Sequence, residues 1–324
     1  MTPTPYTSGT FSRWALATVA LLVGVVGVAG CAPTSGAAPT GAAGAAGSVG
    51  GRTNARKHPT ATTTTTTPTT PTETATTTAT ATATASGGSS GPYSFPLLAP
   101  GATLPSEAYC AAHIQRSSFE PRPANAAANA RTPTSAQIAA LSPWDGSVGL
   151  DPRADQLRLH MTGDFTGTTD EILQWVACVW GVPVDVVRAE AVVESYWDQS
   201  QLGDTSTTQS DCPPGTWNGS SCYQSYGILQ IKYKYFASAW PMSRDDTAFS
   251  AEFVYGQIRA CYEGWTTYLY DRTPLPGYPT YHAGDLWGCV GRWFSGGWYD
   301  QGAVDYIAKV KAAENQKVWL SAGF

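Results

Sequence analysis

The apolar positions between residues 168 and 195 have helical spacing. An apolar stripe over 172–179 follows Thr168 or Thr169, either of which can cap a helix, and Gly181 ends it. Pro183 suits the first turn of a second helix, which continues through PVDVVRAEAVVES with apolar side chains nearly all round. We therefore expect an amphipathic helix followed by one that is largely buried.

The rest of the chain adds two more helices and little regular strand. One helix is expected from Ser243 to about Glu263 and another from Ala303 to Leu320, whereas period-two alternation is confined to a short stretch near Tyr226. Residues 93–160 are irregular and rich in Pro and Ala, so we expect them to pack as an extension on the core of residues 161–324. The pattern predicts a mainly α (α+β) domain with a small irregular or β region.

The N-terminal pattern is that of an exported protein. An apolar run over residues 14–30 follows Arg13, which is typical of a secretory signal; a membrane-spanning helix is the alternative, since about 20 apolar residues cross a bilayer. The stretch Val28-Ala29-Gly30-Cys31 resembles the lipobox of bacterial lipoproteins. That resemblance implies a signal peptide over 1–30, lipidation of Cys31 and an extracytoplasmic protein anchored to the cell membrane.

Residues 31–92 are built from Ala, Gly, Thr and Pro. Such a composition has too little apolar bulk to offset its conformational entropy, so this segment is expected to be a disordered tether.

The six cysteines downstream of Cys31 are an even set, as in the disulfide framework of an exported domain. Cys212 and Cys222 flank a short loop rich in Pro, Gly, Asn and Ser, so we pair them. Six cysteines allow many connectivities, and sequence alone does not separate them. For the other four we take Cys261 with Cys289 and Cys110 with Cys178.

Charge and spacing exclude several other functions. The net charge of −5 argues against nucleic acid as a partner, because phosphate binding needs clustered Lys and Arg. No two cysteines have the C-x₂-C spacing of a zinc site, and the histidines are scattered. We expect a monomer with no metal and no cofactor.

Glu190 and Glu194 are the candidate acids of the buried helix, and their spacing of four places them on one face. Burial of a carboxyl group raises its pKa, as a general acid near neutral pH requires. The alternative is that both are ordinary helix-end charges.

A second motif, SYGILQI over 225–231, changes that balance. Together with the preceding Glu194-Ser195 it resembles the lysozyme-like lytic transglycosylase family, the SLT domains related to goose-type lysozymes. The similarity covers about Thr168 to Val318 and includes the Gly-Val-Pro of 181–183, but the Tyr-Asn pair that the family often carries near its C-terminus is replaced here by WFSGGW over 293–298.

The resemblance implies a lysozyme-like fold and cleavage of the bond between N-acetylmuramic acid and N-acetylglucosamine in peptidoglycan. Glu194 is implied as the general acid and then the base, and Glu190, one turn back, has no such role. Further residues lie in these motifs, or next to them, and are expected to bind substrate: Ser195, Ser225, Tyr226, Gly227, Gln230, Trp298 and Tyr306. Trp197 and Trp217 are further candidates for the sugar-binding groove.

Three readings stay open. A lytic transglycosylase uses one Glu, and the sugar's own 6-hydroxyl closes an anhydro ring, whereas a hydrolase of peptidoglycan or a chitin-like glycan uses water. Two-carboxylate hydrolysis would need a partner such as Asp198, Asp204 or Asp211, but no motif includes them and we favour turn positions for all three. A non-catalytic glycan-binding lipoprotein is the third, although binding alone has no need for a desolvated acid. We favour the single-Glu mechanism.

Overall fold

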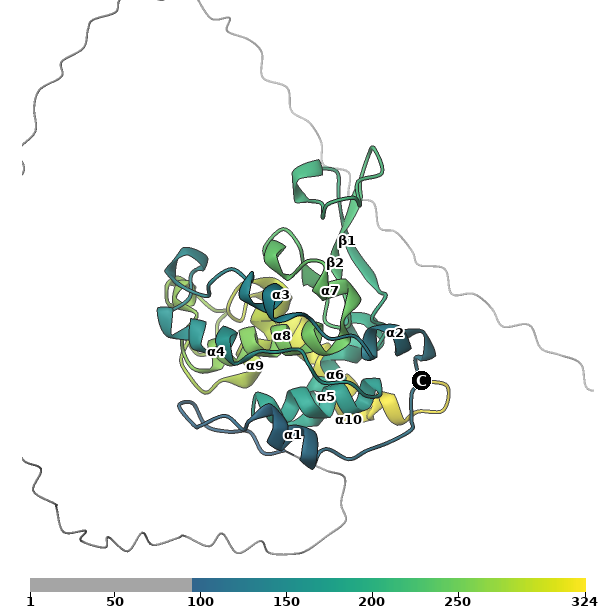
Figure 1. Cartoon of the computed structure of the whole chain (residues 1–324). Coiled ribbons are helices and arrows are strands. Elements are labelled where there is room, and N and C mark those ends of the chain that lie inside the picture. The colour runs from purple at the N-terminus through teal and green to yellow at the C-terminus, as the bar shows by residue number, and fades with distance from the viewer. Residues whose placement is uncertain (1–94) are drawn as a thin grey trace, which may run out of the picture. The chain divides into compact units, whose positions relative to one another are not determined.

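The structure is a computed structural model that describes residues 95–324 (Figure 1). The predicted signal peptide (1–30), the lipidation site Cys31 and the predicted tether (31–92) lie outside the described residues.

Helices make up most of the regular structure. They are α1 (Glu107–His113), α2 (Ala126–Asn129), α3 (Ser135–Ala139), α4 (Asp155–His160), α5 (Thr169–Val179), α6 (Val184–Ser195), α7 (Met242–Asp245), α8 (Thr247–Tyr262), α9 (Leu286–Ser295) and α10 (Gln301–Gln316). The strands are β1 (Leu202–Ser206), β2 (Cys222–Tyr226) and β3 (Ile231–Lys232). A mainly helical fold with a small β region is thereby confirmed.

Local sequence sets the ends of the two central helices. Thr168 caps α5 in a capping box, in which its side chain accepts from the Glu171 N–H and Glu171 accepts from the Thr168 N–H. Pro183 occupies the N-cap of α6, and Tyr196 ends this helix in the left-handed conformation with φ 57°. The predicted N-cap of α5 is confirmed, whereas Pro183, which was expected in the first turn of α6, precedes the helix as its N-cap.

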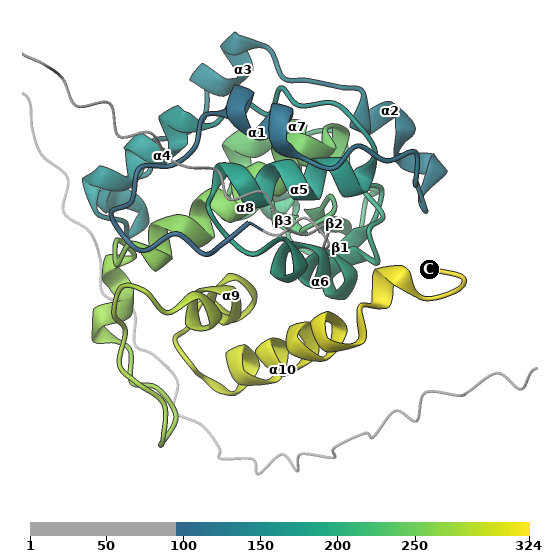
Figure 2. The ribbon, with the colours of Figure 1, turned by 90° about the horizontal axis from the view of Figure 1, so that it is seen from below.

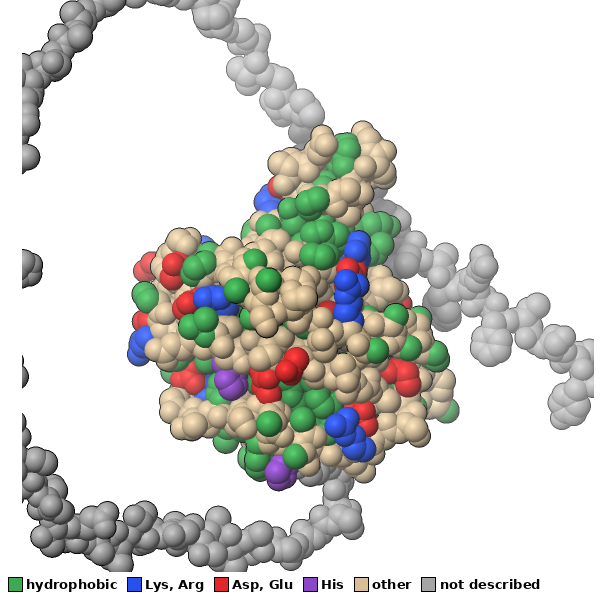
Figure 3. Space-filling model, in the orientation of Figure 1, with side chains coloured by type: hydrophobic (Ala, Val, Ile, Leu, Met, Phe, Trp, Pro, Cys, Tyr) green, Lys and Arg blue, Asp and Glu red, His purple; other side chains and the backbone are tan. Residues whose placement is uncertain are grey.

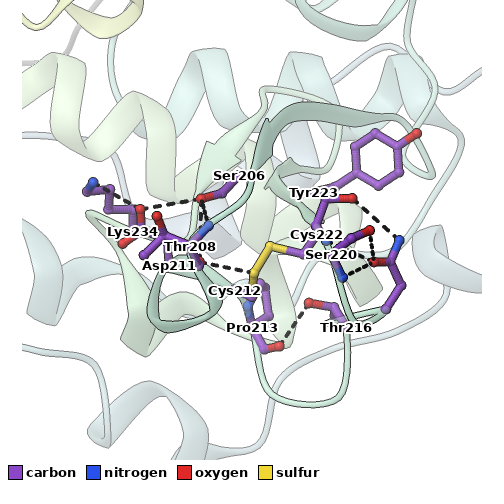
Figure 4. The surroundings of a disulfide bond; sticks show 12 residues. Ser206, Thr208, Asp211, Cys212, Pro213, Thr216, Ser220, Cys222, Tyr223 and Lys234 are labelled. Atoms are coloured by element: carbon purple, nitrogen blue, oxygen red, sulfur yellow. Dashed lines mark hydrogen bonds and ion pairs between the residues drawn. A yellow bond between two sulfur atoms is a disulfide. The ribbon is translucent and has the colours of Figure 1, made fainter.

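The small sheet is antiparallel in the order β1-β2-β3. Leu202 pairs with Tyr226 and Ser206 with Cys222, so β1 and β2 form a long hairpin. The Cys212–Cys222 disulfide closes the loop of this hairpin (Figure 4). Hydrophobic side chains gather over the hairpin on the face that Figure 3 shows.

The core lies where α5, α6, α8, α9 and α10 meet. Helix α6 lies between α5 and α10, while α8 packs against α5 and α9 (Figure 2). Disulfides join Cys110 of α1 to Cys178 of α5 and Cys261 of α8 to Cys289 of α9. All three predicted disulfide pairs are therefore confirmed.

Residues 95–160 are more ordered than their composition suggests. They contain α1 to α4 and short 3₁₀ turns, and side chains such as Leu141, Trp144 and Leu150 are buried in the same core as α5 and α8. Between residues 95 and 324, no helix has the length and apolar character needed to span a bilayer.

Candidate active site

Glu194 lies in the last turn of α6 and is partly exposed. Its Oε1 is 2.5 Å from the hydroxyl of Tyr306 on α10. In the described part of the chain no hydrogen bond is made to its Oε2, so this oxygen is left for a ligand or water. Glu194 thus has one oxygen fixed by the protein and one free.

The surroundings of Glu194 favour its neutral form. Burial raises its pKa from 4.5 to about 7, the Tyr306 hydrogen bond opposes this rise, and the charge of Asp204 adds to it. Its place in the last turn of a helix acts in the same direction, because the helix C-terminus carries partial negative charge. Near neutral pH this carboxyl group can therefore give up or accept a proton.

Glu190 lies one turn earlier and is completely buried. Its Oε2 is 2.6 Å from the hydroxyl of Tyr255 on α8, and its Oε1 is 3.2 Å from the hydroxyl of Tyr306. Burial raises its pKa to about 8, and the charge of Glu194 contributes to the rise. A hydrogen-bonded chain therefore runs from Tyr255 through Glu190 and Tyr306 to Glu194.

Phe294 is a further candidate site residue, which no sequence motif indicated. Its ring stacks on that of Tyr306 with centroids 4.7 Å apart and planes 5° from parallel, and its side chain is 57% exposed. An exposed ring stacked on the hydrogen-bond partner of Glu194 offers a flat apolar surface to a sugar. The sequence shows Phe294 only as one aromatic residue of the WFSGGW stretch. It does not show that this residue lies at the end of helix α9 and against Tyr306.

Asp204 of β1 lies close enough to Glu194 to raise its pKa. Its Oδ2 accepts from the Ser225 hydroxyl at 2.8 Å and pairs with the Lys232 ammonium at 3.1 Å. Burial raises the pKa of Asp204, but these two partners outweigh it and hold the pKa below its usual value. Asp204 is therefore a second carboxylate, in its ionised form, whose charge acts on the candidate acid.

Ser195 joins α6 to the 225–231 loop, and Gly227 packs this loop against Ser243. The Ser195 hydroxyl lies 2.8 Å from the Ile228 carbonyl oxygen, and it is buried. Gly227 has φ +85°, and a Cβ there would lie 2.2 Å from the Ser243 carbonyl oxygen. Glycine is therefore required here by the protein's own packing, and the predicted contact of Gly227 with substrate stays a prediction.

Gln230 stays a predicted substrate-binding residue. Its Nε2 donates to the Gly227 and Gln201 carbonyl oxygens at 2.8 and 3.2 Å. The side chain is partly exposed, and among the described residues no donor bonds to its Oε1. That oxygen can accept from a sugar hydroxyl or an acetamido N–H.

Tyr226 is buried, and its hydroxyl donates to the Tyr223 carbonyl oxygen at 2.8 Å. Together with Tyr223 and Arg244 it lines a hollow of about 410 Å³ beside the hairpin, of which Glu194 is not a part. Tyr226 could therefore contact a substrate only if part of that substrate entered this pocket. Ser225 is also buried, and its hydroxyl donates to Oδ2 of Asp204, so its predicted contact with substrate stays a prediction.

Two of the predicted tryptophans are core residues. Trp298 is 1% exposed and its indole N–H donates to the Pro279 carbonyl oxygen; Trp197 is completely buried and donates to that of Arg188. Neither ring face is available to a sugar, so their assignment to the groove is wrong. Trp217 is partly exposed in the hairpin loop and stays a prediction.

Within residues 95–324, no group of His, Cys, Asp and Glu side chains is placed to hold a metal ion. Comparisons with protein-family models, with curated proteins and with solved structures each found no match for this chain.

Proposed function

We propose that the chain cleaves the β-1,4 bond between N-acetylmuramic acid and N-acetylglucosamine of peptidoglycan, with Glu194 as the single acid and base, in a lysozyme-like fold. The observation that carries the proposal is the state of Glu194: a pKa of about 7, one oxygen held by Tyr306 and the other free. A general acid for a glycosidic oxygen has these properties.

The protonation states follow the reaction in sequence. Neutral Glu194 donates its proton to the leaving oxygen and becomes a carboxylate, which the Tyr306 hydroxyl stabilises at 2.5 Å. The carboxylate then takes a proton from the sugar's 6-hydroxyl, whose oxygen closes an anhydro ring. Phe294 and the Oε1 of Gln230 are the side chains that we assign to sugar binding.

Location and partner follow from the same proposal. Three disulfides fit an oxidising compartment, and peptidoglycan lies outside the cytoplasm. The lipid anchor and tether expected from the sequence would hold the domain near the membrane and let it reach glycan strands.

Asp204 supports the hydrolase as a second candidate. An ionised carboxylate near the acid can orient a water molecule, which would then take the place of the 6-hydroxyl. The two candidates differ in their products, because the lyase yields anhydro-muropeptides and the hydrolase yields products that contain added water.

Digestion of purified peptidoglycan followed by mass spectrometry tests both. We expect Glu194→Gln to lower product release by about 100-fold or more, as loss of a general acid does. Glu107→Gln, the same change at a partly buried glutamate on α1, is the matched control and keeps wild-type release. Equal release by wild type and Glu194→Gln would contradict the proposal.

Asp204→Asn separates the two mechanisms. The single-Glu lyase predicts anhydro products and a loss of less than about tenfold, because only the electrostatic effect on Glu194 changes. A two-carboxylate hydrolase predicts water-added products and a loss of about 100-fold or more.

A further inference from the structure

The hydrogen-bonded chain from Tyr255 to Glu194 joins three helices and is closed to solvent at its inner end. Tyr255 and Glu190 are completely buried and Tyr306 is 2% exposed. The successive oxygens are 2.6, 3.2 and 2.5 Å apart. Two carboxyl groups and two hydroxyls must therefore share their protons among themselves.

The number of available protons determines which group donates in each of these hydrogen bonds. Each tyrosine hydroxyl has one proton to donate. In the described part of the chain, Oε2 of Glu190 is the one partner of the Tyr255 hydroxyl, so Tyr255 donates there. A neutral Glu190 then carries its proton on Oε1 and donates it to Tyr306. The Tyr306 proton is left to point at Oε1 of Glu194.

We infer that Glu190, in its neutral form, is a positioning residue that directs the Tyr306 hydroxyl onto Oε1 of Glu194 and so places the reactive proton of Glu194 on its free Oε2. This inference rests on the proposed function of Glu194. If Glu190 were charged, Tyr306 would donate to Glu190 instead, and Glu194 would turn its own proton inward to Tyr306 on Oε1.

The titratable and charged groups around the hydrogen-bonded chain come from four elements. Glu190 faces Glu194 on α6, Tyr255 on α8 and Tyr306 on α10; Asp204 of β1 acts on Glu194, and Glu314 of α10 acts on Tyr255. The cations near them are Lys232, paired with Asp204, and Lys311 and Lys317, which act on Glu314. With a pKa of about 8, Glu190 is neutral where Glu194, at about 7, works as an acid.

Substitution of Glu190 separates its neutral form from its charge. In Glu190→Gln the amide oxygen accepts from Tyr255 and the NH₂ donates to Tyr306, so the direction of the chain is kept. We expect muropeptide release at pH 6 within about threefold of wild type. Glu190→Leu has the volume but no donor, and we expect a loss of about tenfold or more.

The alkaline side of the pH profile is a readout that a purely structural role would not change. If activity requires both carboxyls to be neutral, wild-type kcat falls about tenfold per pH unit above pH 7 and about 100-fold per unit above pH 8. In Glu190→Gln only Glu194 titrates, so the fall stays about tenfold per unit throughout.

Titration of the ¹³C-labelled glutamate carboxyls by NMR tests the same inference without substrate. We expect two carboxyl steps near pH 7 and pH 8 in wild type, and loss of the higher one in Glu190→Gln. A Glu190 carboxyl that titrates near 4.5 overturns the inference. So does a Glu190→Gln variant as inactive as Glu194→Gln, or a folded Glu190→Leu with full activity. If wild type releases no product, the proposed function fails, while the titration still decides the state of Glu190.

Discussion

Replacing Glu190 by glutamine should make the protein more stable at alkaline pH. Glu190 is completely buried, and the cost of its charge raises its pKa from 4.5 to about 8. Between these two pH values the folded chain binds a proton that the unfolded chain has released. The free energy of unfolding therefore decreases as pH rises from about 4.5, and the full loss is reached above about pH 8.

The magnitude follows from the size of the pKa rise. One pKa unit corresponds to about 1.4 kcal/mol, so ionised Glu190 costs the fold about 5 kcal/mol. Total stabilities of domains are about 5–15 kcal/mol, so this one group can decide whether the fold survives at pH 9. Glutamine has no proton to lose and keeps both hydrogen bonds, so the variant should match wild type at pH 4 within about 1 kcal/mol.

Urea unfolding from pH 4 to pH 9, with the disulfides oxidised, measures this directly. The wild-type and Glu190→Gln curves should separate with rising pH and differ by about 5 kcal/mol above pH 8. In Glu194→Gln the free energy of unfolding should still decrease with rising pH, but by less than in wild type. The reason is that the charge of Glu194 causes only part of the rise in the Glu190 pKa. Parallel curves for wild type and Glu190→Gln would refute the assignment of Glu190 as a buried neutral acid.

Two further predictions concern the fold. Gly227→Ala should lower the free energy of unfolding in urea by more than about 2 kcal/mol, because the new Cβ would meet the Ser243 carbonyl oxygen at a φ of +85°. Gly215 is the control, since it has a similar φ of +78° but open space around it. Gly215→Ala should therefore lose only the left-handed penalty of about 1–2 kcal/mol. Removing the Cys110–Cys178 bridge, with a sequence separation of 68, should cost about 4 kcal/mol against about 3 for the separation of 10 at Cys212–Cys222. Equal losses within either pair would contradict the reasoning.

Helix ends with local signals could be predicted from the sequence, and those set by packing could not. The capping box of α5 depends on residues three apart, which a sequence shows directly. The helix expected from Ser243 is instead divided, because Asp246 accepts from the Phe249 N–H and starts α8 anew. The last helix begins at Gln301, close to the predicted Ala303, and passes into a 3₁₀ turn over Val318–Leu320.

Helix α9 was not predicted because its glycines look like loop residues. Gly288 and Gly291 lie inside the helix, where glycine is unfavourable by about 1 kcal/mol relative to alanine. Both are required by neighbours distant in sequence, since a Cβ on Gly288 would meet the Trp298 ring and one on Gly291 would meet Ile307. The same contact explains why Trp298 is a core residue and not a groove residue.

The role of Glu190 was outside the reach of sequence reasoning for a similar cause. Its partners Tyr255 and Tyr306 are 65 and 116 residues away, and neither belongs to a motif shared with Glu190. Glu194 could be singled out because a known motif and a helix end coincide there. The resemblance pointed to Tyr306 as a substrate-binding residue, whereas the structure buries it and places its hydroxyl between the two carboxyls.

The functions that we propose for Glu190 and Glu194 differ because the protein occupies different numbers of their oxygens. Both oxygens of Glu190 have hydroxyl partners, whereas only one oxygen of Glu194, one helical turn later, has such a partner. An acid with both oxygens bonded can only orient its neighbours, whereas an acid with one free oxygen can exchange its proton with a substrate. The stability lost by burying Glu190 at alkaline pH is thus the physical cost of fixing where the proton of Glu194 lies.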